Sequence, residues 1–62
     1  MMSEIAMVRM LERALGYWKQ GLRHTAAMLV KFAKRFFSFG RLATLMRMVG
    51  FNLDETLVLV RA

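Results

Sequence analysis

Residues 22–39, which read LRHTAAMLVKFAKRFFSF, decide the fold predicted for this 62-residue chain. At about 100° per residue, the apolar and basic side chains of this stretch separate onto two faces of an α-helix. The apolar face comprises Leu22, Thr25, Ala26, Leu29, Phe32, Ala33, Phe36 and Phe37, with Met28 and Val30 at its margins. The other face comprises Arg23, His24, Lys31, Lys34, Arg35 and Ser38. Because the second face has no carboxylate, the pattern predicts a strongly amphipathic helix with one sign of charge.

The segment before this stretch carries a second helical stripe. Ser3 is a suitable N-cap, and Glu4 follows it at the positive end of the helix dipole. Apolar residues then recur at helical spacing, at Met7, Val8, Leu11, Leu15 and Trp18. We expect the chain to turn near Gly21, because one unbroken helix over residues 3–39 would be a rod about 55 Å long with nothing to cover its apolar side.

Two further short helices are expected in the C-terminal part of the chain. Gly40 is suited to end one helix as a C′ residue in the left-handed conformation, and Gly50 is suited to end the next. Between them, one helical face carries Leu42, Leu45, Met46 and Val49. Asn52, followed three residues later by Glu55, matches a capping box and predicts a last helix. The alternative for residues 56–60 is a short strand, because three of these residues are β-branched.

These features predict an all-α protein in which residues 1–62 form a single small helical domain. Three or four short amphipathic helices, broken near Gly21, Gly40 and Gly50, would form a small bundle or hairpin. A unit of this size encloses only about a dozen side chains. Yet 58% of the residues are hydrophobic, including seven Met and five Phe. We therefore expect oligomerisation or a partner to cover the surplus and complete the fold.

Residues that could support catalysis or bind a metal are scarce. The chain has one His, no Cys and four acidic residues, and His24 has no nearby acid that could orient it. No zinc-ligand pattern and no glycine-rich phosphate loop is present. The sequence therefore predicts a protein that is not an enzyme, with no catalytic, cofactor-binding or metal-binding residues. The absence of Cys fits a cytoplasmic protein, and the longest apolar run, residues 26–30, predicts no transmembrane span.

The net charge of +6 and the large apolar content together indicate a binding function. We expect protein–protein interaction, as a small subunit, adaptor or inhibitor that forms a homo-oligomer or binds a larger protein. The predicted apolar partner-binding residues are Trp18, Leu29, Phe32, Phe36 and Phe37. The residues predicted to bind anionic surfaces are Arg23, Lys31, Lys34 and Arg35.

Two alternative functions stay open at this level. The chain could bind nucleic acid without sequence preference, through phosphate contacts alone. It could also lie on an anionic membrane surface as an amphipathic helix. The helical projection places the phenylalanines of residues 32–37 across the helix from the cations, which argues against base stacking beside phosphate contacts. The simplest alternative is that the basic face contacts only solvent.

Overall fold

Four short helices account for the regular secondary structure of residues 3–61, the part of the chain that the computed structural model describes. They are α1 (Glu4–Lys19), α2 (Arg23–Ala33), α3 (Phe39–Val49) and α4 (Leu53–Arg61). The prediction of an all-helical fold is therefore confirmed, and residues 56–60 belong to a helix rather than to a strand.

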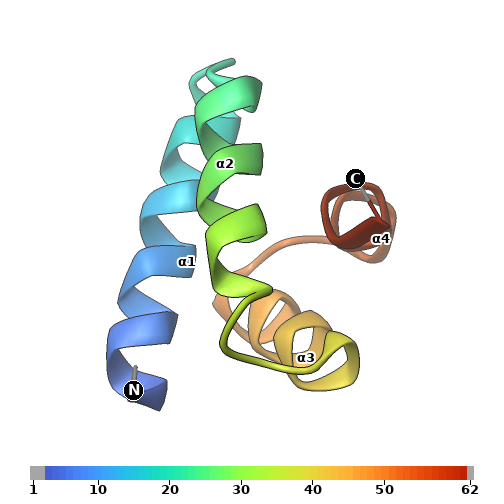
Figure 1. Ribbon diagram of the computed structural model, residues 1–62. Coiled ribbons are helices and arrows are strands. Elements are labelled where there is room, and N and C mark those ends of the chain that lie inside the picture. The colour runs from blue at the N-terminus through green and yellow to red at the C-terminus, as the bar shows by residue number, and fades with distance from the viewer. Residues whose placement is uncertain (1–2, 62) are drawn as a thin grey trace.

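The helices pack around a shared core. Figure 1 shows α1 and α2 side by side as an antiparallel hairpin, with α3 near the end where α1 begins. In the same view, α4 lies beyond α2, on the side away from α1. Helix α1 packs against α2 and α3, and α4 packs against the same two helices. This arrangement leaves the outer sides of α1 and α2 open to solvent.

Most helix ends lie where the local sequence predicts them. Gly21 and Gly50 have φ angles of 84° and 129°, a region of backbone conformation that favours glycine, and each follows a helix. The backbone N–H of Asn52 donates to Glu55 Oε1 at 3.0 Å, and the N–H of Glu55 donates to Asn52 Oδ1 at 2.7 Å. The capping box before α4 is therefore confirmed. At the start of α1, Ser3 Oγ accepts from the N–H of Ala6 at 3.2 Å.

Two helices are separated by a break near Gly40, as predicted, but the role predicted for Gly40 as the residue that ends a helix is wrong. Helix α2 ends at Ala33, and residues 34–38 lead into α3 without regular structure of their own. Gly40 lies inside the first turn of α3, and its φ is not positive. The physical reason is that Ser38 has an extended backbone and acts as the N-cap of α3, with its Oγ accepting from the N–H of Arg41 at 3.4 Å. A capping serine thus begins a helix where the glycine was expected to end one.

The core has the size expected for so short a chain. Twelve apolar side chains are buried within residues 3–61: Met7, Leu11, Ala14, Ala26, Val30, Ala33, Leu42, Leu45, Met46, Phe51, Leu59 and Val60. Three of the six residues that α1 and α2 bury are alanines, which allows the two helix backbones to approach closely.

Helix α2 buries only part of the apolar face predicted from the sequence. Its buried residues are Ala26, Val30 and Ala33, whereas Leu22, Thr25, Phe32 and Phe36 of the apolar face are exposed. The reason is the close approach to α1, which accepts small side chains and leaves no room for the phenyl rings. The predicted apolar face of residues 22–39 is therefore divided, and Phe32 and Phe36 lie outside the core.

Candidate interaction surface

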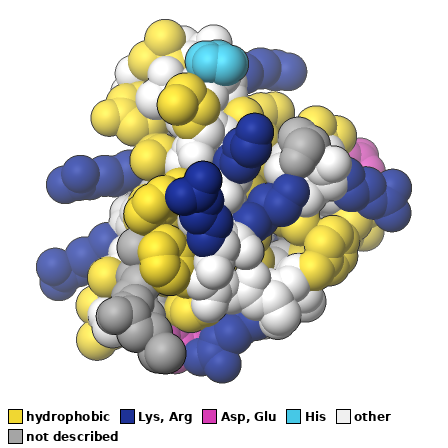
Figure 2. All heavy atoms as spheres, in the orientation of Figure 1, with side chains coloured by type: hydrophobic (Ala, Val, Ile, Leu, Met, Phe, Trp, Pro, Cys, Tyr) yellow, Lys and Arg dark blue, Asp and Glu magenta, His cyan; other side chains and the backbone are white. Residues whose placement is uncertain are grey.

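A single copy of the chain leaves large apolar side chains exposed to solvent. Within residues 3–61 these are Ile5, Leu22, Met28, Phe32, Phe36, Phe39, Met48, Leu53 and Val58. Figure 2 shows Lys and Arg side chains among hydrophobic ones over the α2 side, with Asp and Glu side chains only at the margins of this face. Because exposed apolar groups are unfavourable in water, their grouping marks candidate interaction surfaces.

One group lies on the outer side of α2. Met28, Lys31, Phe32 and Arg35 line a shallow depression of about 220 Å³. The ring of Phe36 packs edge-on against that of Phe32, with the centroids 5.1 Å apart and the planes inclined at 62°. Each of these two phenylalanines has 43% of its surface exposed. We call these five residues the α2 surface.

The structure of the α2 surface differs from the helical projection in the position of Phe32 relative to the cations. Phe32 shares its depression with the side chains of Lys31 and Arg35, so this ring does not lie across the helix from the cations. The argument against stacking beside phosphate contacts therefore fails for Phe32. Lys31 is the direct neighbour of Phe32, and Arg35 lies in the turn that follows α2, so both cations reach the exposed ring.

The other apolar residues predicted to bind a partner have contacts within the fold. Leu29 and Phe37 are half-buried against the core, and the guanidinium of Arg41 lies 5.2 Å from the centroid of the Phe37 ring. Trp18 is also half-buried, and its Nε1–H donates to Glu55 Oε2, which connects α1 to α4. A binding role for these residues stays a prediction, but their contacts show that they support the fold.

The remaining cations predicted to bind anionic surfaces are separated from the depression. The guanidinium of Arg23 lies over the Trp18 ring, 4.6 Å from its centroid, at the opposite end of α2. Lys34 is the C-cap residue of α2 and is half-buried. The structure therefore brings Lys31 and Arg35 together with the exposed rings, and it adds Met28, which the projection placed at the margin.

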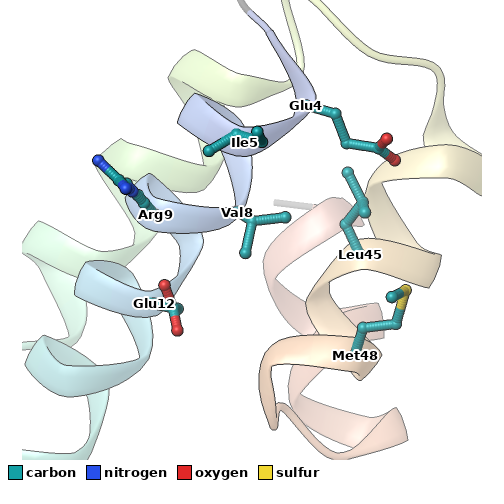
Figure 3. Close-up of a pocket in the computed structure, with 7 residues that line it drawn as sticks. All are labelled: Glu4, Ile5, Val8, Arg9, Glu12, Leu45 and Met48. Atoms are coloured by element: carbon teal, nitrogen blue, oxygen red, sulfur yellow. The ribbon is translucent and has the colours of Figure 1, made fainter.

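Sequence reasoning missed a second concave region, between α1 and α3. This groove has a volume of about 390 Å³ and is lined by Glu4, Ile5, Val8, Arg9, Glu12, Leu45 and Met48. Figure 3 shows Val8 of α1 opposite Leu45 and Met48 of α3. Ile5 and Met48 are 69% and 74% exposed, the highest values among the large apolar residues of the described chain. The sequence signal that could have indicated this groove is Ile5, an apolar residue on the charged side of α1, one turn before Arg9.

The described residues offer apolar and cationic contacts. Within residues 3–61, no group of three or more His, Cys, Asp or Glu side chains is placed to hold a metal ion. None of the four helices has the length and apolar character needed to span a bilayer. An ion pair joins Arg41 Nη2 to Glu4 Oε1 at 3.3 Å, and both side chains are exposed.

Comparison with protein-family models, with curated proteins and with solved structures finds no match for this chain. The chemical character of its exposed surfaces is therefore the basis for a functional proposal. Of these surfaces, the α2 surface alone combines an exposed aromatic pair with two cations in the described part of the chain.

Proposed function

We propose that this chain is a non-enzymatic protein that acts by protein–protein interaction, as a small subunit, adaptor or inhibitor, and that it also associates with copies of itself. The observation that carries the proposal is the exposed Phe32–Phe36 pair beside Lys31 and Arg35. Aromatic and Arg side chains are the residues most enriched among those that dominate binding energy at protein interfaces.

The α2 surface favours a partner with an apolar cleft bordered by Asp or Glu. The cleft would take the two phenyl rings, and the carboxylates would pair with the cations on either side of Phe32. Arg35 can bind a carboxylate through two parallel hydrogen bonds. The net charge of +6 would also speed the encounter with an acidic protein.

The proposal is tested by capturing proteins from the native host with the immobilised chain. We expect a captured protein to be lost when Phe32 and Phe36 are both replaced with serine. Val58→Ser is the matched control, because Val58 is an exposed apolar residue on α4 that does not line the α2 depression. A protein retained by F32S/F36S, or lost equally from V58S, would not be binding through the α2 surface.

Nucleic-acid binding is the second candidate, and the position of Phe32 favours it. A ring that lies beside Lys31 and Arg35 can stack on a base while the cations contact the flanking phosphates. This candidate predicts retention on mixed-sequence single-stranded RNA or DNA that falls steeply with salt and weakens in Phe32→Ala. Absence of retention at low salt would exclude it, and anionic vesicles in the same assay test the membrane-surface alternative.

A further inference from the structure

A stripe of four residues runs along the outer side of α1. Ile5, Arg9, Glu12 and Gly16 follow one another at intervals of four, three and four residues, so they share one face of the helix. Ile5, Arg9 and Glu12 are exposed and also line the groove between α1 and α3. The buried residues of α1 are on its opposite side. We call these four residues the α1 stripe.

Within residues 3–61, no side chain packs against the side of Gly16 where a Cβ atom would lie. It lies inside α1, where glycine is a poor helix former, and its φ is not positive. A Cβ atom built at this position meets nothing within 4 Å. The fold of a single copy therefore accepts a larger residue there, and the glycine leaves the helix backbone open to close approach by another chain.

The α1 stripe is complementary to itself. When two copies of α1 lie antiparallel about a two-fold axis, the register that places Arg9 opposite Glu12 of the second copy also places Glu12 opposite Arg9 of that copy. In the same register, each Ile5 lies opposite Gly16 of the second copy. Arg9 and Glu12 have no ion-pair partner among residues 3–61, so both are available for these contacts.

We propose that the α1 stripe is the surface through which two copies of this chain form a symmetric dimer. Two reciprocal Arg9–Glu12 ion pairs would set the register, and each Ile5 side chain would pack on the backbone at Gly16 of the second copy. Met48, which lines the same groove as Ile5, would extend the apolar contact (Figure 3). The inference rests on the self-association part of the proposed function and names its surface.

Charge distribution favours this surface over the α2 surface for contact between identical chains. Each copy carries a net charge of +6, so a dimer must avoid bringing cations together. Two α2 surfaces would oppose Lys31 and Arg35 to the same side chains of the second copy. The α1 stripe carries one positive and one negative side chain, and the antiparallel register pairs them.

The test is a reciprocal charge reversal, measured by analytical ultracentrifugation at physiological salt. Arg9→Glu and Glu12→Arg each turn both ion pairs into repulsive contacts, and each should raise the dimer Kd roughly tenfold to a hundredfold. The double variant R9E/E12R restores opposite charges and should dimerise like the wild type. A mixture of the two single variants should form a heterodimer, because one then carries two acidic and the other two basic side chains on the stripe.

Arg47→Glu is the matched control, because Arg47 is exposed on α3 and its reversal changes the net charge as Arg9→Glu does. Circular dichroism of each variant establishes that the helices are intact. A wild-type chain that stays monomeric up to about 1 mM would overturn both this inference and the self-association part of the proposed function. Wild-type dimers that R9E and R47E affect equally, or a mixture that stays monomeric, would overturn the α1 stripe alone. Binding through the α2 surface is decided separately, by the F32S/F36S variant.

Discussion

Replacing Glu55 with alanine should destabilise the fold by about 2 kcal/mol, because this one carboxylate connects two helices. Its Oε1 accepts from the backbone N–H of Asn52 at 3.0 Å and thereby completes the capping box of α4. Its Oε2 accepts from the indole Nε1–H of Trp18 on α1. Alanine removes both acceptors and leaves a half-buried indole N–H without its partner.

The magnitude follows from these two contacts. A hydrogen bond from a half-buried donor to a carboxylate contributes about 1 to 1.5 kcal/mol. Loss of the side-chain half of a capping box costs about 0.5 to 1 kcal/mol. A domain of this length has a total unfolding free energy of about 3 to 9 kcal/mol. With a urea m-value of about 1 kcal/mol/M, the unfolding midpoint should fall by about 2 M.

Urea unfolding followed by circular dichroism measures this change. Asp54→Ala is the control, because Asp54 is exposed in the same first turn of α4 and contributes only about 0.5 kcal/mol through the helix dipole. The Trp18→Phe variant supplies a double-mutant cycle, in which Glu55→Ala should cost about 1 kcal/mol less than in the wild type. Equal losses for E55A and D54A would refute the reasoning, and so would an unchanged cost of E55A in the W18F background.

Two glycines should respond in opposite ways to alanine. Gly50→Ala should lower the unfolding free energy by about 1 to 3 kcal/mol, since φ is 129° and the new Cβ would lie 3.0 Å from Leu15 Cδ2. Unchanged stability in urea would show that the chain after α3 adopts another conformation. Gly16→Ala should instead raise the unfolding free energy of the monomer by about 0.5 to 1 kcal/mol, measured at a concentration too low for association. A decrease there would reveal a contact at Gly16 within the fold.

The helix ends that the sequence predicted correctly depend on interactions within a few residues. Asn52 and Glu55 cap each other's backbone N–H groups, and Gly21 and Gly50 adopt positive φ angles that other residues avoid. Such signals need no knowledge of the neighbouring helices. Gly40 was interpreted as the residue that ends a helix. Ser38, two residues earlier, is an equally local signal, but it begins a helix as an N-cap.

The orientation of α2 could not be predicted in the same way. A helical projection places Phe32 and Phe36 with the other apolar residues, but it cannot tell how close the next helix comes. In the structure, α1 presents Ala14 and α2 presents Ala26 and Ala33 in the core that they share. Close packing of the alanines decides which side of α2 faces inward. The α2 surface consists of side chains that this packing leaves outside the core, so its position depends on tertiary structure.

The two proposed surfaces are compatible with one assembly. The residues that line the α2 depression and those that line the groove between α1 and α3 have no member in common. A dimer formed through the α1 stripe would therefore leave an α2 surface on each copy for a partner. Two linked copies of a weak binding surface raise the effective concentration of the second contact, so a partner with two acidic clefts would be held far more tightly than by one copy. Self-association would then increase the affinity of a chain whose single depression is shallow.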